Sequence, residues 1–249
     1  MPEPKVALIT GSGRHRVGNV IALRLAERGY SVALHYHRSQ AEAMETLEEL
    51  ERRGCCAAAL RADVTKEKEV QNLFQDVVRV FGRLDVLVTA AAIWERKPLE
   101  ETTADDVRRH FEVNTLGTFL CCREAGLIMI RQPEGGAIIT IGDWATARPY
   151  LGYSAYFAGK GAIPTLTRVL ALELSRRNPA VRVNCLLPGP VMVPENLSEH
   201  EVKGIVAGTL LRRLGKPENI AQAVLALVEN DYITGVCLPV DGGRTIAPG

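Results

Sequence analysis

The sequence predicts an α/β protein whose core is one doubly wound parallel sheet of about seven strands, with helices on both faces. Apolar strand-like runs recur along the chain, and several are continuous rather than alternating, as expected for strands covered on both faces. Segments with helical periodicity separate these runs. No repeat or linker divides the chain, which predicts a single Rossmann-type domain over residues 1–249. The expected strands are residues 5–10, 31–36, 57–64, 84–91, 136–143, 181–189 and 235–243.

The segments between the strands carry helix start and stop signals. Residues 17–29 place apolar side chains at helical spacing on one face and end at Gly29, a suitable C-cap. Residues 39–54 begin at Ser39, a residue type that favours the N-cap. Residues 190–216 interrupt the strand–helix alternation, and we expect them to form a substrate lid.

Composition excludes several functional classes. Apolar residues make up 47 % of the chain, which argues against disorder. The net charge of +1 gives no electrostatic reason to expect nucleic acid or an anionic membrane as partner. No apolar run approaches the length of a membrane span, and the first residues lack the pattern of a signal peptide. These features predict a cytoplasmic protein that acts on a small molecule.

Cysteine and histidine spacing predicts no metal site. The six cysteines form no C-x-x-C pair, and the five histidines are scattered. We interpret the cysteines as small buried hydrophobes in a reducing cytoplasm. They are Cys55, Cys56, Cys121, Cys122, Cys185 and Cys237.

A glycine-rich turn, TGSGRHRVG at residues 10–18, follows the first strand. Such a turn brings the backbone close to a pyrophosphate, whose charge the next helix N-terminus stabilises. We therefore assign Gly11, Arg16 and Gly18 to cofactor binding. The G-x-G-x-x-G pattern is incomplete because Arg16 stands at the third glycine, and an ordinary tight turn is the alternative.

The end of the second strand, HYHRSQ at residues 35–40, indicates the type of dinucleotide. Enzymes that prefer NAD usually place an acid here to bind the ribose 2′-hydroxyl, and this stretch has none. Its His37, Arg38 and Ser39 suit a 2′-phosphate instead, which predicts NADP(H). The alternative is a solvated basic turn.

The third strand ends in ADVT at residues 62–65. Asp63 either accepts a hydrogen bond from the adenine amino group or caps the helix that starts near Lys66. Both interpretations fit a carboxylate at the edge of the sheet.

Tyr156 and Lys160 lie one helical turn apart in YFAGK, directly after the fifth strand. A nearby ammonium favours the phenolate and lowers the pKa of a tyrosine. Such a phenol can give a proton to a substrate while a nicotinamide gives a hydride. This pattern at this place in a nucleotide-binding sheet predicts an oxidoreductase.

These motifs together resemble the short-chain dehydrogenases/reductases over essentially the whole chain. The further matches are FEVNTLGTF at 111–119, LLPGP at 186–190 and VDGG at 240–243. The resemblance implies that Tyr156 is the general acid/base and that Lys160 holds the nicotinamide ribose. It implies that Asn114 supports a proton-relay water. It also places Val64, Tyr156 and Gly189 at the cofactor, and Tyr156 and Asp143 at the substrate.

Asp143 stands thirteen residues before Tyr156, where the family usually has a serine that orients the substrate oxygen. An ionised carboxylate only accepts hydrogen bonds and repels the oxyanion of a ketone undergoing reduction. It suits a substrate that presents N–H donors or needs a proton at a C=N bond. With a raised pKa, a protonated Asp143 could also donate.

One branch of the family, the pteridine reductases, is similar at these points. It has aspartate at the Asp143 position, arginine at the Arg16 position and HYHRS after the second strand. The resemblance assigns Arg16 to both cofactor phosphates and pterin, and Trp94 to stacking on the pterin. Two positions depart from these patterns: Ala90 stands where the family has an asparagine, and Ala92 where the pteridine reductases often have a serine.

Three functions remain open from sequence. The first is NADPH-dependent reduction of a pterin-like or other C=N heterocycle, and the second is reduction of a carbonyl such as a 3-oxoacyl thioester or a sugar ketone. The third is a non-catalytic NADP sensor. The resemblance also implies a homotetramer, with an interface formed by helices at residues 104–131 and 154–176.

Overall fold

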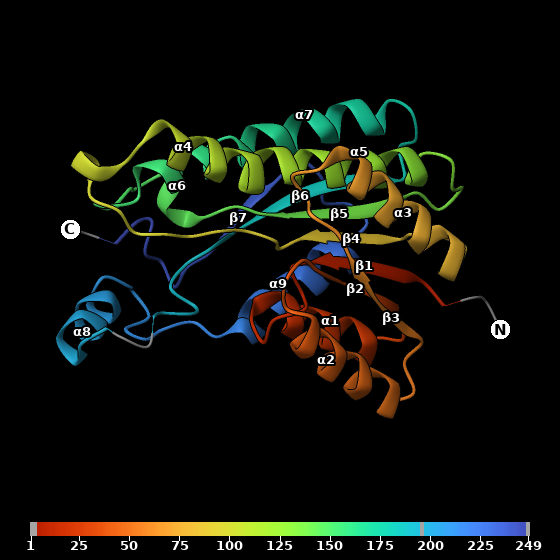
Figure 1. The fold of residues 1–249 in the computed structure, drawn as a ribbon, viewed down its shortest axis with the longest axis horizontal. Helices are drawn as coiled ribbons and strands as arrows, with labels where there is room; N and C mark the ends of the chain where they lie inside the picture. Colours follow the sequence, from red (N-terminus) through yellow and green to blue (C-terminus); the bar gives the residue numbers. More distant parts are fainter. Residues whose placement is uncertain (1–3, 195–196, 248–249) are drawn as a thin grey trace.

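The computed structural model describes residues 4–194 and 197–247 and confirms the predicted architecture. Seven parallel strands form one sheet in the order β3-β2-β1-β4-β5-β6-β7 (Figure 1). Every predicted strand is present at its expected place in the chain. The strands are β1 Val6–Thr10, β2 Ser31–Tyr36, β3 Ala57–Arg61, β4 Val86–Thr89, β5 Gly136–Ile141, β6 Val181–Pro188 and β7 Cys237–Val240.

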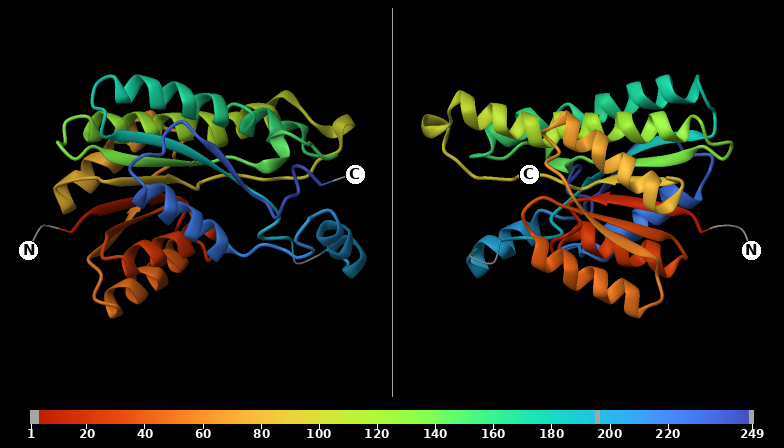
Figure 2. Two further views of the ribbon diagram at one scale, coloured as in Figure 1. Left: turned by 180° about the vertical axis from the view of Figure 1, so that it is seen from behind. Right: turned by 45° about the vertical axis from the view of Figure 1, so that its right-hand side comes forward.

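Helices cover both faces of the sheet. In Figure 1 α3 to α7 lie above it, whereas α1, α2 and α9 lie below, and Figure 2 shows the same two layers from behind. In the described part of the chain, no helix combines the length and apolar character needed to cross a membrane. The helices are α1 Val17–Glu27, α2 Gln40–Arg52, α3 Glu67–Phe81, α4 Ala104–Phe111, α5 Gly117–Met129, α6 Ser154–Lys160, α7 Ile163–Ser175, α8 Glu199–Ala207 and α9 Pro217–Glu229.

The core consists of two apolar layers, one on each face of the sheet. Successive side chains of a strand point to opposite faces, so Leu8 of β1 packs in one layer while Ala7 and Ile9 pack in the other. Phe74 of α3 joins the layer of Leu8, and Ile21 of α1 joins the layer of Ile9. Burial on both faces explains why the strands read as continuous apolar runs.

The N-termini of α2 and α3 differ from the predicted N-caps. Ser39 is the N-cap residue of α2, but its side chain makes no capping hydrogen bond. Helix α3 begins at Glu67 after Lys66, so the N-cap interpretation of Asp63 is wrong. The Asp63 carboxylate instead accepts hydrogen bonds from the backbone N and the hydroxyl of Thr65, at 3.0 and 2.8 Å. It closes a local turn before the helix starts.

The two long helical segments predicted for an interface are each divided. Helices α4 and α5 are joined by a π-helical turn, Glu112–Leu116, that contains Asn114. Helices α6 and α7 are separated by Gly161 and Ala162. A π turn widens the helix locally and is frequent at functional sites.

Residues 190–194 and 197–216 lie outside the sheet, and they include the separate helix α8 beyond the carboxyl ends of the strands (Figure 1). A capping box between Ser198 and Glu201 starts this helix. Glu195 and Asn196, which fall within the predicted lid, lie outside the described residues.

The predicted burial of the cysteines holds for three of the six. Cys121, Cys122 and Cys185 are buried, whereas Cys56 is exposed and Cys55 and Cys237 are partly exposed.

Candidate active site

A cleft of about 1060 Å³ runs along the carboxyl edge of the sheet. The chain proceeds from β1 to β2 and β3 and then returns to β4 on the other side of β1, so a topological switch point lies between β1 and β4. Ligands of open α/β sheets bind outside such a point. The cleft brings together nearly all of the predicted site residues: Gly11, Arg16, Gly18, His37, Arg38, Ser39, Asp63, Val64, Trp94, Asp143, Tyr156, Lys160 and Gly189.

The glycine turn is held in one shape by close backbone packing. Gly11 has φ +69°, and a Cβ there would lie 2.7 Å from Cα of Ala91 in the loop after β4. Only glycine fits this approach without displacing the neighbouring backbone. The backbone N of Gly11 donates a hydrogen bond to Nδ1 of His35, at 3.0 Å. Contacts within the protein therefore hold the glycine turn in one conformation.

His35 is a site residue that the sequence analysis missed. Its ring is 2 % exposed at the end of β2, where Nδ1 accepts from Gly11 and Nε2 donates to the carbonyl of Ala62 at 3.0 Å. Burial lowers the pKa of His35 to about 4, so the ring is neutral at physiological pH. The one sequence signal was a polar residue at a position of β2 that an apolar residue would normally occupy.

Basic and polar groups line the end of the cleft next to β2. Arg38 is exposed there beside His37 and Ser39, and Arg16 is exposed in the glycine turn. Within residues 4–194 and 197–247, the guanidinium groups of Arg16 and Arg38 have no ion pair or hydrogen bond. Donors without partners around a glycine turn fit the phosphates of a dinucleotide, including a 2′-phosphate.

The chemical groups meet at the other end of the cleft. The hydroxyl of Tyr156 on α6 donates to Oδ2 of Asp143, which follows β5, at 2.6 Å. The second carboxylate oxygen, Oδ1, accepts from the backbone N of Ala145 at 2.8 Å. Lys160, one turn further along α6, donates from Nζ to the carbonyl of Ile141 at 2.7 Å. Tyr156 and Lys160 are 5 % and 4 % exposed, so this chemistry would take place away from bulk water.

Burial shifts the pKa values of these groups. It raises the pKa of Asp143, against the opposing effect of the hydrogen bond from Tyr156. It also raises the pKa of Tyr156 well above its ordinary value, and the neighbouring Asp143 carboxylate raises it further. Burial lowers the pKa of Lys160.

The expectation that Lys160 lowers the pKa of Tyr156 is therefore wrong for this structure. The group next to the phenol is the Asp143 carboxylate, and the ammonium of Lys160 binds a backbone carbonyl. Asp143 and Tyr156 instead form a proton-sharing pair, in which the less acidic phenol donates and the carboxylate accepts.

Asn114 lies behind the wall of the cleft and is fully buried. Its Oδ1 accepts from the backbone N of Ile93 at 2.9 Å, and its Nδ2 donates to the carbonyl of Ile93 at 3.0 Å. These two bonds fix the loop after β4 that carries Trp94. The structure thus gives Asn114 a positioning contact, and the role in a proton relay stays a prediction.

Aromatic side chains form the wall beside the proton-sharing pair. The indole of Trp94 stacks on Tyr153 with centroids 5.0 Å apart, and its Nε1 donates to the hydroxyl of Tyr150 at 3.3 Å. Tyr150 packs against Trp144, and the guanidinium of Arg244 lies 4.9 Å from the centre of the Trp144 ring. Sequence reasoning predicted only Trp94, because the other rings reach the cleft from a loop with no regular spacing.

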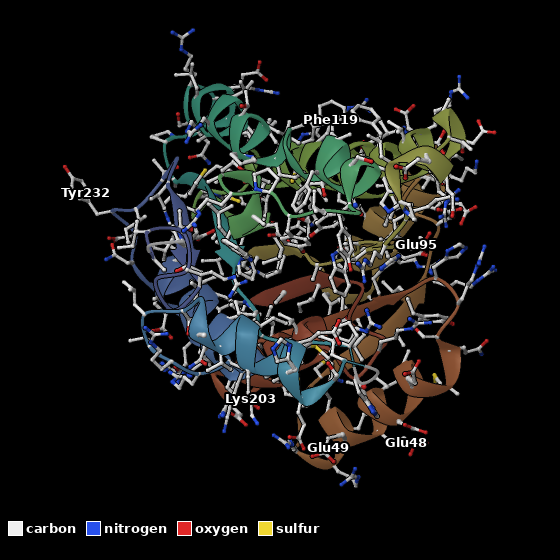
Figure 3. All side chains as sticks on the ribbon, turned by 90° about the vertical axis from the view of Figure 1, so that its left-hand side faces the viewer. Glu48, Glu49, Glu95, Phe119, Lys203 and Tyr232 are labelled. Carbon is white, nitrogen blue, oxygen red and sulfur yellow. The ribbon has the colours of Figure 1, made fainter. Side chains whose placement is uncertain are left out.

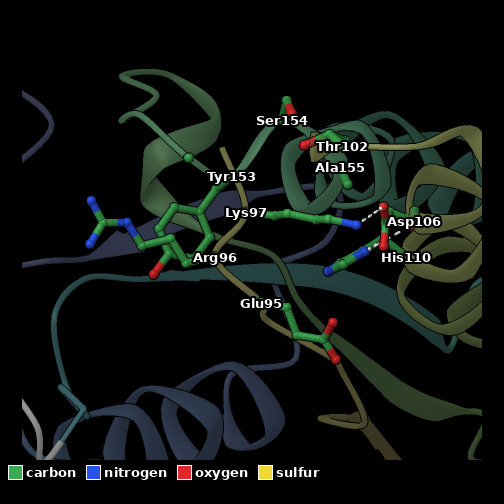
Figure 4. A pocket seen from close by; sticks show the side chains of 10 residues that line it. Glu95, Arg96, Lys97, Thr102, Asp106, His110, Tyr153, Ser154 and Ala155 are labelled. Atoms are coloured by element: carbon green, nitrogen blue, oxygen red, sulfur yellow. Dashed lines mark hydrogen bonds and ion pairs between the residues drawn. The ribbon is translucent and has the colours of Figure 1, made fainter. Parts of the chain in front are cut away.

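A second cavity of about 50 Å³ adjoins the cleft at Tyr153 (Figure 4). Lys97 pairs with Asp106 inside it, and Nδ1 of His110 donates to the carbonyl of Asp106 at 2.8 Å. Nε2 of His110 is buried and has no hydrogen-bond partner among the described residues. The polar lining and the size of the cavity suit ordered water.

The fold, with a glycine turn and a tyrosine–lysine pair lining one cleft, is that of a nucleotide-binding oxidoreductase, and comparison with known proteins identifies its family. A family model described as Enoyl-(Acyl carrier protein) reductase matches residues 13–245. A "Short-chain type dehydrogenase/reductase" from Picea abies is 36 % identical, with 96 % of this chain and 92 % of that protein aligned. "Carbonyl reductase family member 4" from Xenopus tropicalis is also 36 % identical, over 96 % of this chain and 97 % of its own.

A solved structure supports the same conclusion. The crystal structure of acetoin dehydrogenase from Enterobacter cloacae is 34 % identical and covers all of this chain and 98 % of its own, with a TM-score of 0.89. The protein belongs to the short-chain dehydrogenase/reductase family. It is an oxidoreductase of a family that uses a nicotinamide cofactor, NAD or NADP.

Proposed function

We propose that the protein is an NADPH-dependent reductase that adds a hydride to the C=N bond of a pterin-like or other nitrogen heterocycle. The observation that carries this proposal is the 2.6 Å hydrogen bond between the Tyr156 hydroxyl and Oδ2 of Asp143. In this pair a carboxylate occupies the place beside the tyrosine where a ketone oxygen would need a hydrogen-bond donor.

The pair can serve a nitrogen heterocycle in both of its protonation states. Ionised, Asp143 accepts hydrogen bonds from ring N–H or amino groups. Because burial raises the pKa of Asp143, the protonated acid is also accessible and can donate to a ring nitrogen. Reduction of the C=N bond then takes a hydride at carbon and a proton at nitrogen, and Tyr156 or Asp143 supplies that proton.

The cofactor proposal rests on the basic end of the cleft. Gly11, Gly18 and Arg16 would hold the pyrophosphate, and His37, Arg38 and Ser39 the 2′-phosphate. Asp63 and Val64 would contact the adenine, and Gly189 and Lys160 the nicotinamide half. A bound nicotinamide supplies the hydride.

Substrate binding is assigned to the aromatic end of the cleft. Trp94 is 40 % exposed and offers a flat surface near the proton-sharing pair. The resemblance to the pteridine reductases also assigns Arg16 to the substrate. Residues 190–216 would form the lid, because Met192, Leu197 and Ile205 of this segment line the cleft.

Carbonyl reduction is the second candidate, and one observation favours it. The chain is similar over almost its full length to a protein named a carbonyl reductase and to a protein named an acetoin dehydrogenase. A non-catalytic sensor is a weaker alternative, since Tyr156 and Lys160 are both retained at the cleft.

We further propose a homotetrameric cytoplasmic enzyme. Large apolar side chains stay exposed on the outer helices α4, α5 and α7, and Figure 3 labels one of them, Phe119, on the outer helical layer. Such residues fit an interface between copies of the chain. They are Val107, Phe111, Phe119, Val169 and Leu172.

A substrate panel tests the proposed reaction. The purified protein is assayed for NADPH oxidation with dihydrobiopterin, dihydrofolate, a 3-oxoacyl thioester, acetoin and a sugar ketone. We expect the highest kcat/KM with a dihydropterin. Turnover of the ketones alone would assign the protein to the second candidate, and no turnover with retained NADPH binding would favour the sensor.

A further inference from the structure

Two cysteines lie side by side at the end of the sheet nearest α7. Cys185 of β6 and Cys237 of β7 are register partners in adjacent parallel strands. Thr140 of β5 is the register partner of Cys185 on its other side and hydrogen-bonds Thr167 of α7, at 2.7 Å. The thiol of Cys237 points to the carbonyl of Pro164, also in α7, at 3.8 Å. Both thiols therefore face the same helix.

This placement satisfies the main geometric condition for a disulfide. Neighbouring strands of a sheet are about 4.7–4.9 Å apart, which falls within the Cα separation of about 4.4–6.8 Å that disulfides span. Register partners in a parallel pair project their Cβ atoms to the same face. The sulfur atoms of Cys185 and Cys237 can then meet without a change in strand register.

The two thiols differ in access and reactivity. Cys185 is fully buried, whereas Cys237 is partly exposed. Interaction with the Cys185 thiol lowers the pKa of Cys237, and the charge of Arg168 acts in the same direction. Interaction with Cys237 and burial raise the pKa of Cys185. Because a peroxide can reach the partly exposed Cys237 and not the buried Cys185, Cys237 is the thiol that reacts first and Cys185 the one that can resolve it.

We propose that Cys185 and Cys237 form a redox-active dithiol that is converted to a disulfide by a peroxide. The Cys237 thiolate attacks one peroxide oxygen, the O–O bond breaks, and with one proton the products are a sulfenic acid and water. The Cys185 thiol then attacks the sulfenic sulfur, and a second water leaves as the S–S bond forms. Together the two cysteines lose two protons and two electrons, and the peroxide gains them to form two water molecules.

The dithiol touches the segment that carries the catalytic carboxylate. A Cβ placed on Gly142 would lie 3.1 Å from Sγ of Cys185, so this sulfur packs against the residue immediately before Asp143. A disulfide brings the two sulfur atoms to about 2.0 Å from each other, so the Cys185 side chain must turn toward Cys237. The Cys185 sulfur then moves away from Gly142, and the support behind Asp143 loosens. Oxidation should therefore lower kcat more than it weakens cofactor binding.

Mass spectrometry after peroxide treatment tests the disulfide. The full-length protein is titrated with hydrogen peroxide, alkylated and digested. We expect a Cys185–Cys237 cross-linked peptide two hydrogens lighter than the sum of its reduced parts, reversible by dithiothreitol. Both thiols remaining free at a dose that oxidises the exposed Cys56 would overturn the proposal, as would oxidation of Cys237 to sulfinic acid with Cys185 still free.

Variants test the link to the active site. Peroxide should lower kcat of the wild type several-fold. In the Cys237→Ser variant, peroxide should leave kcat unchanged. In the matched control Cys56→Ser, peroxide should lower kcat as in the wild type. Disulfide formation with unchanged kcat would refute the coupling to Gly142. This effect on turnover rests on the proposed roles of Asp143 and Tyr156, whereas the cross-linked peptide is independent of any substrate, so the two proposals can fail separately.

Discussion

The two ends of the cleft are built in different ways. At the cofactor end the backbone sets the shape: Gly11 approaches Ala91 too closely for any side chain, and the buried ring of His35 holds the turn. At the substrate end the side chains set it: Asp143 bonds Tyr156, and Trp94 stacks on a tyrosine. The shape of the cofactor end therefore depends on the backbone, while the shape of the substrate end depends on individual side chains.

This difference predicts that the two functions can be separated. Changes at Asp143 or Tyr156 should alter turnover and leave cofactor binding intact. Changes near β2 should alter cofactor choice and leave the chemical step intact. Such independence is expected for groups that share no contacts.

The largest effect is expected from Tyr156→Phe, which keeps the ring and removes the proton. Turnover should fall by about 10²–10⁴, the usual contribution of a general acid. The Kd for NADPH, measured by fluorescence titration, should stay unchanged. Tyr232→Phe is the matched control, because Tyr232 is 98 % exposed and far from the cleft, at the edge of the view in Figure 3. Near-normal turnover of Tyr156→Phe would contradict the role of Tyr156 as general acid and show that another group supplies the proton.

The next effect concerns cofactor choice. Arg38→Ala should weaken NADPH binding by about 1.5–3 kcal/mol, the scale of a charged hydrogen bond, and leave NADH binding nearly unchanged. Arg16→Ala is the comparison, since a contact with the shared pyrophosphate should weaken both cofactors alike. Calorimetric Kd values for both cofactors measure the difference. An equal loss for NADPH and NADH in Arg38→Ala would contradict the assignment of the 2′-phosphate site.

His35 makes the cofactor end sensitive to acid. The pKa of His35 is lowered from 6.5 to about 4. Between pH 4 and pH 6.5 the imidazole of His35 therefore binds a proton in the unfolded chain but not in the native state. Stability should therefore rise with pH across this window, and lowering the pH from 7 to 5 should cost on the order of 2 kcal/mol in the free energy of unfolding. Urea unfolding at both pH values measures this cost.

Two variants sharpen this measurement. His35→Gln should flatten the pH dependence by most of that amount, because the titrating ring is gone. His200→Gln, at an exposed position on α8, should leave the dependence as in the wild type. The same pH dependence in all three proteins would show that another buried group titrates in this window.

The contrast between the two ends also explains how much the sequence could predict. Strands, glycine turn and the Tyr156–Lys160 spacing follow from local patterns, and all are where they were expected. His35 was missed because its role depends on contacts with Gly11 and Ala62, which are distant in sequence. The pKa of Tyr156 was misjudged because spacing alone cannot show which neighbour its hydroxyl contacts.

The three-dimensional fold also explains two outcomes that the sequence did not predict, the hydrogen bonding of Asp63 and the proximity of Cys185 and Cys237. Asp63 has the chemistry of an N-cap, but the helix starts four residues later and the carboxylate turns back to Thr65. Cys185 and Cys237 are 52 residues apart and meet only because β6 and β7 pair in register. Local sequence carries no signal for either outcome.

The most direct test of the central claim is kcat/KM for one dihydropterin and one ketone, in the wild type and in Asp143→Ser. A carboxylate beside a forming alkoxide adds like-charge repulsion, whereas beside a ring N–H it gains a charge-assisted hydrogen bond. Serine should therefore raise ketone reduction and lower dihydropterin reduction by ~10-fold or more, about 1.4 kcal/mol. A wild type that already prefers the ketone, or a parallel change with both substrates, would contradict the role of Asp143 in substrate selection.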